Sequence, residues 1–438
     1  MSEVRQRPYH ALRHRDYRLL GAATLISIIG TEMQNVGIDW HVYVLTRSPL
    51  ALGAVGLVRA VPLIVFSMWG GIVADRNDRK VVQFTTQSAM LLIALALAVT
   101  TWLGRDTLWL VYLLTGLTAT ASAFDAPARH ALIPRLVSKD DLPGALSLNV
   151  TFMQIAMITG PAIAGVILGA TAASRTAHST HALAPIYFSN AASYVAVLIA
   201  LFSLRASGKP EPGAVHHESW VASLRMGFQF LFSMRIILWT MTLDFFATLF
   251  SGAISLLPIV ADQILHVGAQ GYGWMRAAPG AGALLASILT SVRPLARRQG
   301  PLLLWSVAAY GAATIVYGLS HNLFLTVAAL AAAGAADLFS TVIRHTLRQV
   351  LTPDELRGRI TGFNMMFVIG GPQLGEMEAG FMASLFMPVA LGTMISIVSG
   401  GAATVLLVGL MAALSPTIRN FTLTMGEAER SPAPVKTD

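Results

Sequence analysis

Hydrophobic residues in this chain occur in blocks of about twenty, separated by short polar stretches. A helix of that length crosses the hydrocarbon core of a bilayer. Six blocks precede a longer polar stretch, and six follow it. The predicted spans are Leu19–Leu45, Ala51–Ala74, Val81–Leu103, Leu108–Phe124, Gly144–Ala170, Ala182–Leu204, Ile236–Ala261, Gly271–Val292, Pro301–Leu319, Leu323–Val342, Gly358–Met387 and Pro388–Leu414. The pattern therefore predicts an all-α membrane protein with twelve transmembrane helices.

Polar segments divide the chain into five parts. These are a terminal segment 1–18, a six-helix bundle 19–204, a linker 205–235, a second six-helix bundle 236–414 and a tail 415–438. The linker is rich in proline, glycine and histidine, and Trp220–Phe232 within it has the pattern of an amphipathic surface helix. The first part lacks the cleavage site of a signal peptide, so we expect the first span to remain in the mature protein.

The composition argues against a water-soluble enzyme, since 55% of the residues are hydrophobic and only 12% are charged. The chain has no cysteine, which excludes disulfides, thiolate metal sites and cysteine nucleophiles. The loop histidine pairs His178/His181 and His216/His217 lack a third ligand, so we expect no metal site there. No HExxH, GxSxG or Walker A pattern occurs. We therefore expect no enzyme activity and no cofactor, and an ion gradient as the energy source.

Basic residues are distributed in a way that indicates topology. Of the 30 lysines and arginines, 25 fall in the terminal segments and in every second loop, 3 fall in the alternate loops, and Arg59 and Arg276 lie inside spans. Membrane proteins keep positive loops in the cytoplasm. We therefore expect a multi-pass protein of the inner membrane with both termini cytoplasmic. The net charge of +8 gives no basic soluble face, which argues against a nucleic-acid partner.

The chain repeats itself at about half its length. The segment from Gly56 to Pro62 (GLVRAVP) matches that from Gly273 to Pro279 (GWMRAAP), at an offset of 217. The tetrapeptide that begins at Arg129 (RHAL) matches the one that begins at Arg344 (RHTL), at an offset of 215. Two matches at nearly one offset indicate two homologous bundles, as in many transporters.

The segment that follows the second span, GIVADRNDRK, brings an acid and three bases into a tight loop at Gly71, Asp75, Arg76, Arg79 and Lys80. It resembles the loop signature of the major facilitator superfamily, with Asp78 where a glycine is common. The resemblance implies a major facilitator fold of two pseudo-symmetric bundles. It also implies a gating latch in which Asp75 and Arg79 pair with Asp125. For Arg76 and Lys80, a charge cluster that only sets topology remains the alternative.

Two further segments refine the resemblance. Span five contains GPAIAG from Gly160, and span eleven contains GPQLG from Gly371. Small residues of this kind often serve helix packing alone, but in span five they resemble the motif of drug and solute exporters. The segment that runs from Phe124 to Asn149 is most similar to the enterobactin-exporter branch. The resemblance implies efflux, although related loops also occur in lysophospholipid transporters of the superfamily.

Polar residues form a stripe on four spans. Their members are Ile28, Glu32, Asn35 and Asp39 in span one; Thr115, Thr118, Ser122 and Asp125 in span four; Thr240, Asp244, Thr248, Ser251 and Ser255 in span seven; and Gly334, Asp337, Thr341 and Arg344 in span ten. The spacings of three and four place each set on one helical face. Ionisable groups at membrane depth are expected to face a cavity or a partner. We therefore predict that these spans line a central cavity, as their counterparts do in the superfamily.

Acids in that cavity are candidates for proton coupling: Glu32, Asp39 and Asp244 first, then Asp337. Arg59 lies at about the depth of Asp39, so we predict an Arg59–Asp39 ion pair that protonation breaks. The alternative for each acid is a carboxylate that a neighbour satisfies, with no transport role. Glu376 and Glu378 are two residues apart and cannot both face one cavity.

Candidates for lining the substrate cavity lie beside these acids: Asn35, Trp40, Phe124, Phe245, Thr248, Phe339 and Glu376. The aromatic members suggest a bulky, partly apolar ligand, although aromatic residues in membrane spans often serve packing alone. The overall prediction is a monomeric secondary transporter that exports a hydrophobic or amphipathic small molecule, such as a siderophore or drug, in exchange for protons. Membrane lipids surround it. The alternatives are a lipid or lysophospholipid flippase that uses Arg59 or Arg276 for a phosphate, and a receptor that does not transport.

Overall fold

The computed structural model describes residues 8–172, 180–209, 229, 231–232, 234–292 and 298–422. Throughout this described part the secondary structure is helical, without strands. The predicted amphipathic helix Trp220–Phe232 falls almost entirely outside it, as do His178, His216, His217 and the tail from residue 423 onward.

The described helices form two bundles. The N-terminal bundle contains α1 (Arg15–Thr46), α2 (Pro49–Arg76), α3 (Arg79–Trp102), α4 (Leu108–Leu132), α5 (Leu142–Ala172) and α6 (Ala184–Ser203). The C-terminal bundle contains α8 (Arg235–Phe250), α9 (Leu257–Ile259), α10 (Gly268–Val292), α11 (Gln299–Leu319), α12 (Leu323–Leu351), α13 (Asp354–Ser384) and α14 (Val389–Leu414). Two short 3₁₀ helices, η1 (Pro8–Arg13) and η2 (Ile133–Arg135), and the helix α15 (Pro416–Arg419) lie at one end.

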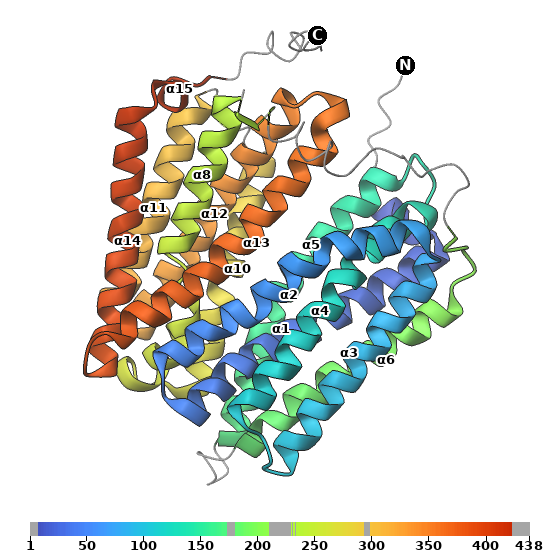
Figure 1. Ribbon diagram of the computed structural model, residues 1–438, viewed down its shortest axis with the longest axis horizontal. Helices are drawn as coiled ribbons and strands as arrows, with labels where there is room; N and C mark the ends of the chain where they lie inside the picture. The colour runs from blue at the N-terminus through green and yellow to red at the C-terminus, as the bar shows by residue number, and fades with distance from the viewer. Residues whose placement is uncertain are drawn as a thin grey trace.

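That end, which carries η1 and α15, is called proximal here, and the opposite end, which carries Arg47 and Asp262, is called distal. The bundles contact one another through α2 against α13 and α5 against α10. Figure 1 shows them side by side at the distal end and diverging toward the proximal end. One hydrophobic core, with members such as Val36 and Leu256, joins both bundles distally, whereas the cores around Leu132 and Ile343 each belong to a single bundle.

Glycines allow the bundles to approach closely. A Cβ atom placed on Gly165 of α5 would lie 2.8 Å from the Cα atom of Gly273 on α10, and one placed on Gly53 of α2 would lie 3.0 Å from the Cα atom of Gly380 on α13. Such distances leave no room for a side chain, so backbone packs directly on backbone. Small residues serve this purpose in many membrane proteins.

The sequence predicts most helices closely, and the seventh span is the main difference. That span was expected to be one helix, but α8 ends at Phe250 and is followed by the 3₁₀ turn η4 (Ala253–Leu256), α9 and the π-helical segment η5 (Val260–Ile264). Pro258 supplies no backbone N–H to the helix. Gly252 packs against the backbone of Gly375. Both features favour a break that hydrophobicity alone does not reveal.

Nine helices in the described residues are long and apolar enough to cross a membrane, by length and composition. The long helices α1, α10 and α13 are not among them, and these carry Glu32, Arg276 and Glu376 respectively. Nine of the twelve predicted spans thus coincide with such helices, and membrane crossing by α1, α10 and α13 stays a prediction.

Candidate functional site

Asp39 is the centre of a charged cluster between the bundles. Its side chain on α1 is only 4% exposed. Arg59 of α2 donates a hydrogen bond to Asp39 Oδ1 over 3.0 Å, and Tyr272 of α10 donates to Oδ2 over 3.3 Å. Arg276, also on α10, lies 3.7 Å from the same Oδ2 atom. The structure thus contains the Arg59–Asp39 ion pair expected from sequence, and adds partners from the other bundle.

Two further acids complete this cluster. Glu32 of α1 and Glu376 of α13 both lie close enough to Arg59 and Arg276 to interact with them electrostatically. Three carboxylates therefore share two guanidinium groups. With all five groups ionised the cluster carries one excess negative charge, so it can accept a proton without losing its arginine pairing.

The internal repeat explains where the arginines lie. Arg59 and Arg276 are the matched residues of the two repeated segments, on equivalent helices of the two bundles. Both reach Asp39, whereas the corresponding region of the C-terminal bundle, around Ser255, has no acid. A symmetric pair of bases therefore converges on one acid that belongs to the N-terminal bundle.

A second cluster lies within the C-terminal bundle. Arg344 of α12 forms an ion pair with Asp244 of α8, and its Nη2 atom lies 3.8 Å from Asp337 Oδ1. The side chain of Asp244 is buried, while that of Asp337 is 49% exposed. The sequence placed Asp244, Asp337 and Arg344 on facing stripes, and the structure brings them together. Their role in proton coupling stays a prediction.

The predicted cavity residues fall into two groups. Near the second cluster, the rings of Phe245 and Phe367 pack edge to face with 5.6 Å between their centroids. The hydroxyl of Thr248 donates a hydrogen bond to the backbone carbonyl oxygen of Asp244. Near the first, Trp40 stacks on Tyr272 at 5.6 Å, and the carbonyl oxygen of Asn35 accepts a hydrogen bond from Arg59.

Phe124 and Phe339 stand apart from these groups. The ring of Phe124 packs against that of Phe66 on α2, with 6.2 Å between the ring centroids, and Phe339 is partly buried on α12. Of the predicted lining residues, Trp40, Phe124 and Phe245 thus each have an aromatic packing partner. A role in binding substrate stays a prediction for all seven.

The expected latch contact is absent from the described residues. Arg79 donates to the carbonyl oxygen of Ala131 at the end of α4, and Asp75 and Arg76 are exposed. Asp125 accepts hydrogen bonds from Gln87 and Thr86 of α3, over 3.0 and 3.1 Å.

Helix geometry gives the reason. Asp125 lies six residues before Ala131, about 9 Å deeper into the bundle, beyond the reach of Arg79. Asp125 therefore faces α3 and not a central cavity, which corrects the expectation for the stripe on span four. A Cβ atom at Gly71 would meet nothing within 4 Å, so this glycine makes no close contact that requires it.

Sequence reasoning missed a contact that closes the distal end. Arg47, which follows α1, forms an ion pair with Asp262 of η5 and stacks over the Tyr43 ring at 4.5 Å. The Tyr43 hydroxyl donates to Asp262 and accepts from Gln263 Nε2 over 3.2 Å. This group, here called the distal lock, joins segments about 215 residues apart. Only the packing of one bundle on the other could identify it.

A buried trio supports the distal end of the N-terminal bundle. His41 of α1 is hydrogen-bonded to Asp106 over 2.7 Å and to Tyr187 of α6 over 3.0 Å. Burial alone would raise the pKa of Asp106, but hydrogen bonds from His41 and Thr180 hold it below its ordinary value. The carboxylate therefore ties the loop between α3 and α4 to α1 and α6.

We expect Asp262→Asn to favour separation of the bundles at the distal end. The Arg47–Asp262 pair is partly exposed, so its loss costs about 1 kcal/mol, a shift of about fivefold in the population of the closed state. The chain has no cysteine, so a single cysteine at Leu256, which is fully buried near α2, can report opening by its rate of labelling. Labelling should accelerate with Asp262→Asn and not with Arg105→Gln, a charge removal in another distal loop. Equal rates in both backgrounds would argue against the lock.

Comparisons with known proteins agree with this architecture. The family model described as "Transmembrane secretion effector" matches residues 6–435. The enterobactin exporter EntS of Shigella boydii is 26% identical over 377 residues, which cover 86% of this chain and 87% of that protein. The same exporter from Escherichia coli O1:K1 has the same identity and coverage.

Solved structures show the same fold at low sequence identity. A bacterial homologue of the lysosomal transporter Spinster, in an inward-facing conformation, has a TM-score of 0.70 at 14% identity and covers 92% of this chain and 95% of its own. A D-xylose-proton symporter has a TM-score of 0.70 at 13% identity, and the match covers 92% of this chain and 99% of the symporter. With the family model matched over nearly its whole length, the chain belongs to the transmembrane secretion effector family, whose members are multi-pass membrane transporters of the major facilitator superfamily.

Proposed function

We propose that this transporter exports an amphipathic small molecule in exchange for protons, by alternating access of two bundles to one central site. The observation that supports the proposal best is the position of Asp39. It is a buried carboxylate of the N-terminal bundle that contacts Arg59 in its own bundle and Arg276 in the other. A group with that position can couple its own protonation to the separation of the bundles.

The proposed cycle follows from the charges. Ionised Asp39 attracts Arg276 across the boundary between the bundles and favours the distally closed arrangement described here. When the substrate-loaded bundles separate distally, the substrate leaves and Asp39 takes up one proton from the distal side. Protonation removes the attraction between Asp39 and Arg276, and Glu32 and Glu376 then serve as alternative partners for the arginines. Return to the proximally open state releases the proton on the other side.

The proposed substrate class follows from the surroundings. Near the second cluster, Phe245 packs edge to face against both Phe246 and Phe367. Such groups suit a molecule with an aromatic or apolar body. Export as the direction is supported by the likeness to enterobactin exporters over 86% of the chain. A flippase that uses Arg59 or Arg276 for a phosphate is less well supported, since both arginines already lie against Asp39.

Reconstitution into liposomes tests this proposal. Efflux of a catecholate siderophore, the lipophilic cation rhodamine 6G and a lysophospholipid is followed with and without an imposed pH gradient. We expect accumulation of the siderophore or of rhodamine 6G only when the gradient is present, and its loss when nigericin collapses the gradient. Flux that is the same with and without the gradient would contradict proton coupling. Movement of the lysophospholipid alone would favour the flippase.

A further inference from the structure

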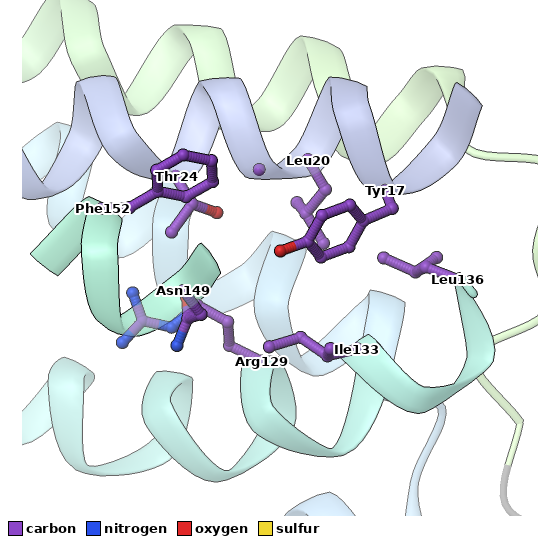
Figure 2. Close-up of a pocket in the computed structure, with 9 residues that line it drawn as sticks. Tyr17, Leu20, Thr24, Arg129, Ile133, Leu136, Asn149 and Phe152 are labelled. Carbon is purple, nitrogen blue, oxygen red and sulfur yellow. The ribbon is translucent and has the colours of Figure 1, made fainter. Parts of the chain in front are cut away.

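A narrow pocket lies inside the N-terminal bundle at its proximal end, away from both charged clusters. Figure 2 shows its lining, with Tyr17 and Thr24 from α1 on one side, Arg129 from α4 on the other, and Asn149 and Phe152 from α5 beside them. Leu20, Gly21, Ile133 and Leu136 complete it. It has room for a group about the size of a water molecule. The pocket can therefore admit a single oxygen atom of an anionic group, while the rest of the ligand stays outside it.

Arg129 carries a positive charge in this pocket that no carboxylate of the described residues pairs with. Among the described residues its guanidinium group has no ion pair and no hydrogen bond, and its Nε atom is buried without an acceptor. The nearest acid along the helix, Asp125, is one turn away and is held by Gln87 and Thr86 of α3. A partly buried guanidinium without a counter-charge is costly. Such a cost is readily explained if the group binds a ligand.

The internal repeat supplies a direct comparison. Arg344 is the counterpart of Arg129 at the offset of 215, and Asp244 of α8 neutralises it. The corresponding positions of α1 are Ser27, Ile28 and Ile29, none of which is acidic. The C-terminal bundle thus pairs its arginine internally, whereas the described part of the N-terminal bundle offers Arg129 no ion-pair partner.

The neighbours of Arg129 suit an anionic group. Thr24 offers a hydroxyl and Asn149 an amide, both of which can donate hydrogen bonds to an oxygen atom. The Tyr17 hydroxyl is held by its hydrogen bond to the carbonyl oxygen of Ala145, over 2.7 Å. Phe152 supplies an apolar wall. Arginine binds carboxylates and other oxyanions with paired, charge-assisted hydrogen bonds.

We propose that the pocket around Arg129, Thr24 and Asn149 binds the negatively charged end of the exported molecule, so that the substrates of this transporter are organic anions with an aromatic or apolar body. This inference rests on the proposed export function, for which it names the substrate class. The site lies at the proximal end, which is the cytoplasmic end in the predicted topology. It would capture the anion where export begins, before the body of the molecule reaches the central clusters.

Three probes with the same body test this inference. Pyrenebutyrate is an anion, pyrenebutanol is neutral, and pyrenebutyl-trimethylammonium is a cation. Binding of each to the full chain in nanodiscs is measured by equilibrium dialysis. We expect pyrenebutyrate to bind at least about tenfold more tightly than pyrenebutanol, because only the carboxylate can form a charge-paired, hydrogen-bonded contact with the guanidinium group of Arg129. The cation should bind most weakly of the three.

Variants then assign the preference to Arg129. Arg129→Gln should remove the difference between pyrenebutyrate and pyrenebutanol while leaving pyrenebutanol binding unchanged, and Arg129→Lys should keep part of it. The matched control is Arg135→Gln, which removes the same charge six residues later at the same end but outside the pocket. It should keep the full difference.

The outcomes separate this inference from the function on which it rests. No preference for the anion in the wild type, or a preference that survives Arg129→Gln, would overturn the anion site even if gradient-driven efflux is observed. Absence of gradient-driven flux of both the siderophore and rhodamine 6G in wild-type liposomes would instead contradict the export function itself. Unchanged pyrenebutanol binding in Arg129→Gln also shows that the variant is folded.

Discussion

Asp39→Asn is expected to reduce pH-driven efflux to the level of empty liposomes while leaving substrate exchange in the absence of a gradient largely intact. Asparagine keeps the size of the side chain but cannot take up a proton. It also removes the charge that holds Arg59 at 3.0 Å and Arg276 at 3.7 Å. Exchange of labelled for unlabelled substrate needs no net proton movement, so it should persist. The measurement is flux in liposomes with and without a pH gradient.

Two companion variants sharpen that test. Asp39→Glu retains a titratable group and should keep measurable coupling. Arg59→Ala should abolish coupling, because Arg276 alone then holds Asp39 from the other bundle and the pair within the N-terminal bundle is lost. Gradient-driven efflux at the wild-type rate in Asp39→Asn would remove Asp39 from the mechanism. The same result in Arg59→Ala would restrict the essential contact to Arg276.

Sequence patterns predict the central cluster only in part. Helical spacing places Glu32, Asn35 and Asp39 on one face, and relative depth brings Arg59 to Asp39. The internal repeat also identifies Arg276 as the residue equivalent to Arg59 in the C-terminal bundle. The convergence of both arginines on one acid depends on how α10 packs against α1 and α2, and periodicity within one helix carries no information about such packing.

Other features differ from prediction for related reasons. Asp125 shares a helical face with Thr118 and Ser122, yet its neighbour is α3, because a polar face can satisfy its groups within a bundle as well as in a cavity. The distal lock joins Arg47 to Asp262, two loop residues that carry no periodic signal. Each case depends on contacts between helices, which the pattern along one helix cannot specify.

Arg344→Gln is expected to be the most destabilising single change in the C-terminal bundle, lowering the free energy of unfolding by about 3–5 kcal/mol. The substitution leaves the buried carboxylate of Asp244 beside Asp337 with no guanidinium group to neutralise either. Asp244→Asn should cost less, because Arg344 keeps Asp337 as a second, partly exposed acid at 3.8 Å. Unfolding of the purified protein by titration with sodium dodecyl sulfate measures both changes.

The double variant Asp244→Asn with Arg344→Gln provides the control, because it removes both buried charges and leaves only the partly exposed carboxylate of Asp337 without its guanidinium partner. Its stability should lie closer to the wild type than that of Arg344→Gln, since much of the cost of a broken buried pair is the desolvation of the remaining charge. The difference between the double variant and the sum of the single variants measures the coupling of the two residues. Arg344 also donates hydrogen bonds to the hydroxyl of Thr341, over 2.9 Å, and to the carbonyl oxygen of Ser340. Additive losses of stability would mean that Arg344 stabilises the bundle through these two contacts and not through Asp244.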